Sequence, residues 1–183
     1  FVKIEISGKG ALALLQKVCT NNIDVKVGKV VYTVISNIYG GIKSDLTVSR
    51  LEEDKFWILA GAGNGMIDLS WFKENTPKDG SVNIIDWTSA YAGVGLWGPN
   101  SRKVLESLCE DDDVSNEQFP FFSIKIKSPN PIIFFRYSSC SGFVHGVSAK
   151  KIIRIICVKT CMIYYPRWYA STCRDWINLP FIT

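Results

Sequence analysis

The 183-residue chain lacks the features on which several classes of protein depend. No stretch reaches the roughly 18 uninterrupted apolar residues that a membrane-spanning helix requires, so no membrane span is predicted. Glycine (14) and proline (7) are too few for a collagen-like or low-complexity sequence, and 47% hydrophobic residues with 21% charged residues exclude a disordered chain. The remaining composition is globular and sufficient for one or two domains with a substantial core.

Cysteine and histidine are also scarce. Six cysteines in 183 residues do not make a disulfide scaffold. Cys19 and Cys109 lie in segments typical of apolar helix faces, so reduced thiols and an intracellular compartment are expected. No Cys-x-x-Cys pair occurs, and no metal site is predicted. The other candidate zinc ligands also do not have the spacing of a common zinc site. They are His145, Cys157, Cys161 and Cys173.

Acidic residues are missing from a long C-terminal stretch. No Asp or Glu occurs between Glu117 and Asp175, whereas an ordinary domain mixes charges of both signs. Residues 128–183 contain seven Lys or Arg and one acid, so they carry +6, while residues 1–127 carry −2. The net charge of +4 therefore belongs to the C-terminal part alone.

Residues 138–183 form an atypical, basic and cysteine-rich tail. Their periodicity indicates neither helix nor strand consistently, so little regular structure is expected there. The basic residues alternate with isoleucine and valine instead of forming a patch, and no nucleic-acid-binding motif accompanies the aromatic residues of the tail. Nucleic acid is therefore not an expected partner.

Residues 1–137 show the periodicities of strands and helices. Strands are expected near residues 2–6, 29–37, 44–50, 55–60, 81–86, 90–97, 121–126 and 131–137. Helices are expected at about 11–18 and 64–75, with a third that starts near Asn100 or Ser101 and carries Val104, Leu105 and Leu108 on one face. The predicted fold class is α+β, with mixed or antiparallel sheets flanked by helices.

No signature of nucleophilic hydrolysis, P-loop phosphate binding or dinucleotide binding is present. The glycine-rich segment 61–65 lacks both the Gly-x-Gly-x-x-Gly spacing and a Walker lysine, so it is interpreted as the entry loop of a helix. The single histidine, His145, has no acid near it in the tail, which argues against a role as general base.

One acid stands in an unusual place. Gly40 and Gly41 predict a turn, and Asp45 follows at the start of a strand, where aspartate is disfavoured. Two explanations remain open for Asp45. It is either a turn-capping or solvated side chain, or a carboxylate that is held over a ligand.

Four separate blocks of the sequence carry a resemblance to a known family. They are residues 3–25, 40–51, 96–105 and 115–121. In their order and spacing they resemble the folate-binding, aminomethyltransferase T-protein-like domain of the dimethylglycine and sarcosine dehydrogenase family, from residue 1 to about residue 137. The resemblance implies a partial folate-binding domain at 1–137, followed by a tail that departs from the family.

In this family, a flavin domain oxidises an N-methyl amine and the folate domain captures the one-carbon unit on tetrahydrofolate as methylenetetrahydrofolate. By motif position, the resemblance implies that Asp45 is the catalytic acid beside the reactive folate nitrogens, where a carboxylate can position an amine and accept its proton. It implies that Tyr32 and Thr47 also contact folate, and that Phe121 and Phe122 pack on its rings.

The resemblance also implies a longer protein. We expect FAD in a flavin-binding domain that precedes this chain, which itself has no dinucleotide fingerprint and is not expected to oxidise substrate alone. The chain starts at Phe1 without a signal-peptide pattern and is interpreted as a fragment. The family is cytoplasmic in bacteria and in the mitochondrial matrix in eukaryotes, and these two locations stay open.

The family pattern ends after Ser138. The resemblance leads one to expect a block similar to Gly-Glu-Leu-Gly-Trp-Glu, whose first Glu binds the pterin, but residues 139–146 contain no acid. Burying the pterin N–H donors unpaired costs about 1–3 kcal/mol. An alternative function is therefore a non-catalytic regulatory or structural relative that has lost folate binding. A related hypothesis is a frameshifted or mispredicted gene, which sequencing the transcript across codons 125–145 would test.

Overall fold

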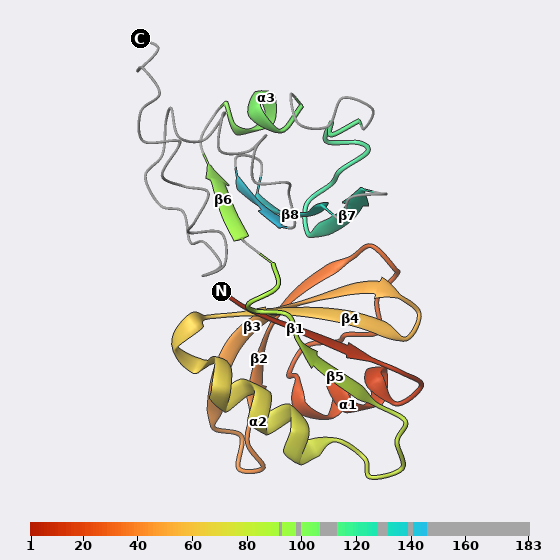
Figure 1. The fold of residues 1–183 in the computed structure, drawn as a ribbon. Helices are drawn as coiled ribbons and strands as arrows, with labels where there is room; N and C mark the ends of the chain where they lie inside the picture. Colours follow the sequence, from red (N-terminus) through yellow and green to blue (C-terminus); the bar gives the residue numbers. More distant parts are fainter. Residues whose placement is uncertain (92, 98–99, 107–112, 128–131, 139–140, 146–183) are drawn as a thin grey trace.

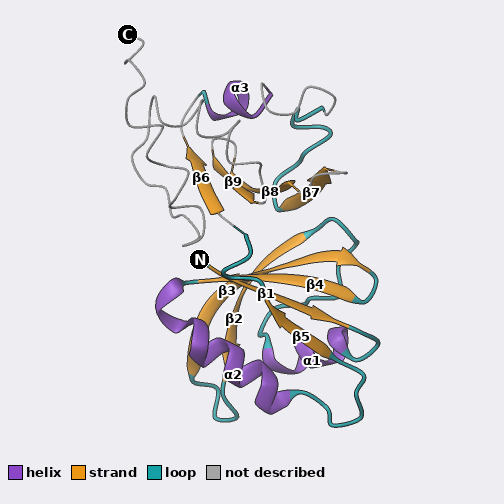
Figure 2. Ribbon diagram, in the orientation of Figure 1, coloured by secondary structure: helices purple, strands orange, loops and turns teal. Residues whose placement is uncertain are grey.

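The computed structural model describes residues 1–91, 93–97, 100–106, 113–127, 132–138 and 141–145. These residues form two antiparallel sheets, with two helices covering the outer face of the larger one (Figures 1 and 2). The larger sheet contains β1 (Val2–Ser7), β2 (Val30–Ser36), β3 (Ile42–Glu52), β4 (Lys55–Ala60) and β5 (Asn83–Asp86). Its helices are α1 (Ala11–Val18) and α2 (Gly65–Asn75), the latter preceded by the short 3-10 helix η1 (Ala62–Asn64).

The smaller sheet lies on the other side of the larger one. It contains β6 (Gly93–Trp97), β7 (Ser123–Lys127), β8 (Ile132–Ser138) and β9 (Ser141–His145), and α3 (Ser101–Glu106) follows β6. The strand order is β2-β3-β4-β1-β5 in the larger sheet and β6-β9-β8-β7 in the smaller one, and every described pair is antiparallel. The predicted α+β class is confirmed.

Short turns place β2, β3 and β4 side by side. The turn between β2 and β3 uses Gly40 at a φ of +80°, a conformation that glycine adopts without the steric cost of a Cβ atom. The side chain of Asn37 accepts hydrogen bonds from the backbone N–H groups of Tyr39 and Gly41, each at 2.9 Å, and thus closes the turn. This turn fixes which residues of β2 and β3 face each other.

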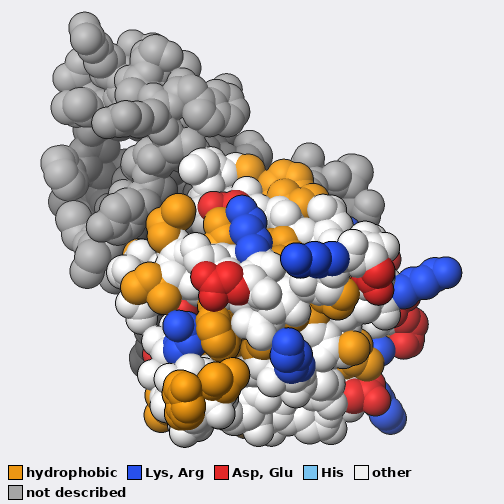
Figure 3. Space-filling model, turned by 90° about the horizontal axis from the view of Figure 1, so that it is seen from below, with side chains coloured by type: hydrophobic (Ala, Val, Ile, Leu, Met, Phe, Trp, Pro, Cys, Tyr) orange, Lys and Arg blue, Asp and Glu red, His pale blue; other side chains and the backbone are white. Residues whose placement is uncertain are grey.

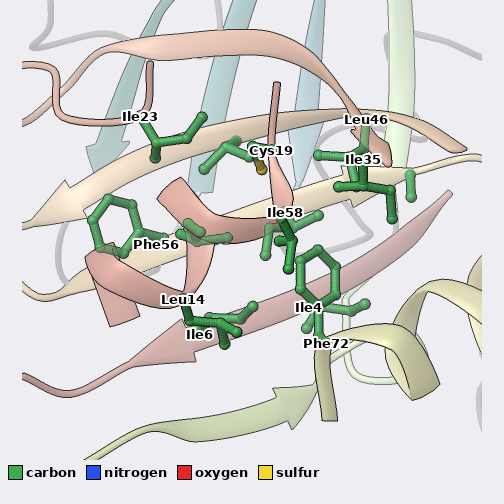
Figure 4. Close-up of a cluster of buried hydrophobic side chains, with 14 of the residues drawn as sticks. Ile4, Ile6, Leu14, Cys19, Ile23, Ile35, Leu46, Phe56, Ile58 and Phe72 are labelled. Carbon is green, nitrogen blue, oxygen red and sulfur yellow. The ribbon is translucent and has the colours of Figure 1, made fainter. Parts of the chain in front are cut away.

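The main core lies between the larger sheet and helices α1 and α2. Successive residues of a strand point to opposite faces, so Ile4 and Ile6 of β1 and Ile58 of β4 point to the helices, where Leu15 and Phe72 meet them. Figure 4 shows several of these side chains in contact. The sequence therefore forms this layer from the alternate residues of each strand and one face of each helix.

A second, smaller cluster connects the two sheets. Trp57, Val30 and Leu59 of the larger sheet pack against Ile124 of β7. The backbone joins the same region, since the Val30 N–H donates to the Phe122 carbonyl at 2.8 Å and the Ile124 N–H donates to the Gly28 carbonyl at 2.9 Å. The opposite face of the larger sheet is therefore covered by β7 at one end.

The surface on the helix side mixes charges of both signs. In Figure 3, Lys and Arg side chains are interspersed with Asp and Glu and with single apolar groups. No helix in the described part of the chain is both long and apolar enough to cross a membrane. Cys19 lies in the main core as a free thiol, and burial raises the pKa of its thiol to about 12.

The predicted elements and the observed ones agree in type and order up to β8, with ends that differ by a few residues. One strand, β9, was not predicted, because residues 138–183 were expected to have little structure. It pairs with β6 on one side and β8 on the other, so long-range pairing supplies what the local pattern lacks. Leu108, Cys109 and residues 146–183 lie outside the described residues. For residues 146–183, the predicted lack of regular structure therefore stays a prediction.

Candidate functional site

Asp45 lies near the start of β3 and faces away from the helices. In the antiparallel pair of β2 and β3, Asp45 is opposite Val34 and Thr47 is opposite Tyr32. Opposed residues and alternate residues of neighbouring strands share a face, so these four side chains lie on the same side of the sheet. The hairpin thus brings together three of the residues that the sequence predicted for the site.

A hydrogen bond joins two of these residues directly. The Tyr32 hydroxyl donates to Asp45 Oδ2 at 2.8 Å. Both side chains are exposed, and Tyr32 retains 53% of its accessible surface. The hydrogen bond to Asp45 is the main cause that raises the pKa of Tyr32, and burial and the charge of Asp45 add to it. Tyr32 therefore remains a protonated donor at neutral pH.

Asp45 and Tyr32 form part of the wall of an open hollow. Its volume is about 320 Å³. The wall is built by Phe1, Tyr32, Asp45, Leu46, Thr47, Leu59, Ala60 and Gly61. It combines one carboxylate, one phenol and one hydroxyl with apolar side chains, which is the usual make-up of a small-molecule site.

Five of these wall residues were not predicted from the sequence, and Leu46, which lies between Asp45 and Thr47 in β3, is one of them. Leu59 and Ala60 lie opposite Thr47 and Leu46 in the pairing of β3 with β4, so the register of that hairpin is the signal that would have identified them. Phe1 and Gly61 are the other two. Nothing in the chemistry of Phe1 marks it in advance, because it reaches the hollow only through the pairing of β1 with β4.

Residues 61–65 lead into α2 as expected, but they are not a loop, because Ala62–Asn64 form η1 and Gly65 is the first residue of α2. Gly61 contributes to the wall of the hollow, and a Cβ atom added there would meet nothing within 4 Å. A Cβ atom at Gly65 would collide with the side chain of Val2. Gly65 therefore lets the helix approach the sheet closely, and no phosphate-binding role is needed to explain it.

The structure does not bring Phe121 and Phe122 into this hollow. They lie just before β7, with 49% and 43% of their surface exposed, and neither belongs to the described wall. Phe122 has a φ of +49°, in the left-handed region that is uncommon for a residue with a side chain. Its carbonyl accepts the hydrogen bond from the Val30 N–H. Their predicted contact with folate stays a prediction.

Comparison with known proteins gives a family match over most of the chain. Residues 1–133 match the GCVT N-terminal domain. The chain is 37% identical over 107 residues to the aminomethyltransferase of Halothermothrix orenii, covering 58% of the chain and 29% of that protein. It is 34% identical over 110 residues to the mitochondrial pyruvate dehydrogenase phosphatase regulatory subunit of Mus musculus, covering 61% and 12%.

An oxidase is also among the relatives. The 4-methylaminobutanoate oxidase (formaldehyde-forming) of Paenarthrobacter nicotinovorans is 32% identical over 112 residues, covering 61% of the chain and 14% of the oxidase. The chain thus spans less than a third of each of these three proteins.

Two solved structures share the fold. Aminomethyltransferase T of the glycine cleavage system from Bartonella henselae superposes with a TM-score of 0.71 at 20% identity, over 84% of this chain and 42% of that one. The heterotetrameric sarcosine oxidase from Corynebacterium sp. U-96, solved with pyrrole 2-carboxylate, gives a TM-score of 0.61 at 15% identity, over 99% and 83%. At these identities the two structures show the fold alone.

Proposed function

Because the chain belongs to the GCVT N-terminal domain family of aminomethyltransferase-like proteins, we propose that it binds tetrahydrofolate and serves as the one-carbon-capturing part of a larger enzyme. The observation that carries this proposal is Asp45, held by Tyr32 in the wall of an open hollow. When bound, tetrahydrofolate supplies the amine nitrogens that take up the one-carbon unit. The residues of the chain supply a place for it and a proton acceptor.

The hollow suits a reduced pteridine in size and in lining. Ligand sites usually enclose about 300–1,000 Å³ and are mostly apolar with a few polar groups, and the hollow of about 320 Å³ lies within this range. Leu59 and Phe1 offer apolar surface to a planar ring system. Asp45, Tyr32 and Thr47 offer the polar groups that would orient it.

Asp45 is arranged to receive a proton. Its Oδ2 atom accepts the hydrogen bond from Tyr32, and no other described side chain donates a hydrogen bond to Asp45. Its Oδ1 atom is thereby left for the N–H group of a bound amine. A carboxylate at hydrogen-bond distance from that group can hold the amine in place and accept its proton. Through this hydrogen bond, Tyr32 holds the carboxylate in one orientation.

We infer that an oxidising partner is needed to complete the reaction. The names of two similar proteins, a methylaminobutanoate oxidase and a heterotetrameric sarcosine oxidase, support a flavin-binding domain or subunit as this partner. That partner, and not this chain, would bind and oxidise the N-methyl amine. This chain would bind the tetrahydrofolate that accepts the one-carbon unit.

Calorimetric titration with tetrahydrofolate tests the proposal. We expect saturable binding by the 183-residue chain, and a loss of affinity of about tenfold or more in Asp45→Asn, because the amide no longer offers a charged acceptor. Asp54→Asn is a matched control, since Asp54 is an exposed aspartate in the turn between β3 and β4. Equal affinity in the chain and in Asp45→Asn would refute the role of Asp45.

A regulatory relative without folate binding is the second candidate. It is favoured by the similarity to the pyruvate dehydrogenase phosphatase regulatory subunit and by the absence of an acid from residues 139–146. If the folded chain shows no heat of binding with tetrahydrofolate at any concentration, this candidate replaces the first one. The same titration therefore decides between the two.

A further inference from the structure

Strand β3 contains a bulge immediately before Asp45. Ile35 of β2 pairs with Ser44, but the next residue, Ser36, pairs with Ile42, so Lys43 is an extra residue in β3. A bulge of this kind interrupts the strict alternation of side chains and changes where the following residue points. The direction of Asp45 therefore depends on how the bulge is held.

Helix α2 contacts both residues of this bulge. The ammonium group of Lys43 lies 4.4 Å from the centroid of the Trp71 ring, and the Ser44 hydroxyl donates to Asp68 Oδ2 at 3.1 Å. Asp68 and Trp71 are three residues apart on α2 and so lie on one side of the helix. Lys43 and Ser44 thus both meet the helix, and Asp45 turns to the hollow on the opposite face.

The contact between Ser44 and Asp68 is buried. Ser44 is 5% exposed and Asp68 is fully buried. Asp68 Oδ1 has no hydrogen-bond partner among the described residues. Burial is the main cause that raises the pKa of Asp68, and the nearby charge of Asp45 raises it further, against lowering by the hydrogen bond from Ser44 and by the charge of Lys43. A buried hydrogen bond between two elements is sensitive to small displacements.

We propose that Asp68 is a positioning residue that aims Asp45 at the hollow, through its hydrogen bond to Ser44 at the β3 bulge. The inference rests on the proposed role of Asp45. Because side chains alternate along a strand, fixing Ser44 toward the helix fixes Asp45 toward the other face. Loss of this contact leaves the bulge free to shift, and Asp45 then no longer stays within reach of the Tyr32 hydroxyl.

The pKa of Tyr32 reports the position of Asp45 without any ligand. We would measure it in the 183-residue chain by NMR titration of the labelled tyrosine rings, with the Tyr32 signal assigned from Tyr32→Phe. Ser44→Ala and Asp68→Ala should lower the pKa of Tyr32 toward the ordinary tyrosine value of about 10. Asp68→Asn keeps an oxygen that accepts from Ser44 and should leave the pKa of Tyr32 unchanged.

A matched control separates positioning from packing. Ser49 lies in the same strand, is fully buried, and its hydroxyl has no hydrogen-bond partner among the described residues, so Ser49→Ala should leave the pKa of Tyr32 unchanged. If Ser44→Ala and Asp68→Ala lower the melting temperature but leave the Tyr32 pKa where it was, the contact only holds the helix to the sheet and the inference is wrong.

The same variants, titrated with tetrahydrofolate, distinguish the two proposals. A lowered Tyr32 pKa together with weaker binding, by about tenfold as for Asp45→Asn, supports both. A lowered Tyr32 pKa in a chain that never binds folate supports the positioning role and overturns the proposed function.

Discussion

Strand β3 carries Asp45 near one end and Arg50 near the other, and the two side chains differ in how many hydrogen bonds and ion pairs they make. Arg50, near its C-terminal end, is 8% exposed and its guanidinium makes ion pairs with Asp24 at 2.7 Å and with Glu53 at 3.0 Å. Asp45, near its N-terminal end, is exposed, and among the described side chains only the neutral hydroxyl of Tyr32 donates a hydrogen bond to it. Each residue lies next to a bulge, since β3 also shifts its register with β4 after Arg50.

The difference separates a charge that stabilises the fold from one that is available for chemistry. The guanidinium of Arg50 also donates to the carbonyls of Val25 and Glu53, and it lies 5.5 Å from the ring of Phe56, so most of its binding capacity is used within the chain. A buried charge must be satisfied in this way. Asp45 retains an acceptor oxygen and solvent access, as a group that binds a ligand must.

Arg50→Ala should cause the largest loss of stability. It removes several charge-assisted hydrogen bonds that attach residues 24–25 to β3, and such bonds contribute about 1.5–3 kcal/mol each when a charged group is involved. Because the contributions are not additive and both carboxylates are exposed, we expect a loss of about 3 kcal/mol in the free energy of unfolding. Urea denaturation followed by tryptophan fluorescence would measure it.

Arg50→Lys is the matched variant for this measurement. Lysine keeps the charge but lacks the planar fork that reaches two acceptors at once, so it should recover less than half of the lost stability. Full recovery by lysine would show that the net charge at position 50 matters and the fork does not. The difference between Arg50 and Asp45 would then depend on their charges alone, and the number of hydrogen bonds that each makes would not matter.

Asp68→Asn should change how stability depends on pH, by a smaller amount. The folded state raises the pKa of Asp68 above the unfolded value, so between these two pKa values the folded state binds more protons than the unfolded state. This contribution to stability is present below the unfolded pKa, about 3.9, and it is lost as pH rises through the folded pKa. The asparagine variant has no such loss.

Denaturation curves of both proteins from pH 3 to pH 8 would test this sign. We expect Asp68→Asn to gain in stability relative to the original chain as pH increases over this range. A constant difference would mean that Asp68 has the same pKa in both states. The burial of its carboxyl would then have no electrostatic cost, and its hydrogen bond with Ser44 would be the whole of its effect.

Local sequence patterns were sufficient for most of the fold. Alternation in β1 and the helical spacing of α1 are local signals, and both elements lie where they were expected. Strand β9 has no such signal, because residues 141–145 include a glycine and do not alternate. Its place depends on pairing with β6, more than 40 residues earlier in the chain. The spacing of apolar residues within a short segment does not predict pairing over such a distance.

The proximity of the candidate site residues was predictable where it depends on one hairpin. Tyr32, Asp45 and Thr47 lie in neighbouring strands joined by a short turn, so the sequence already implied that they share a region. The contact of Ser44 with Asp68 was not predictable, because it depends on how α2 packs across the sheet. No pattern in the sequence marks which of the buried polar residues meet, and packing between elements decides it.

Tyr32→Phe should have the smallest effect on stability and a clear effect on ligand binding. Its hydroxyl is exposed and bonds only to Asp45 among the described side chains, so the midpoint of thermal unfolding should stay within error of the original. Tetrahydrofolate affinity should fall about tenfold, the usual result of removing one hydrogen bond to a charged group. Tyr39→Phe is the control, since Tyr39 is 88% exposed at the tip of the same hairpin. If Tyr32→Phe instead unfolds the protein and leaves the affinity of the folded fraction unchanged, Tyr32 belongs with Arg50 among the residues that stabilise the fold.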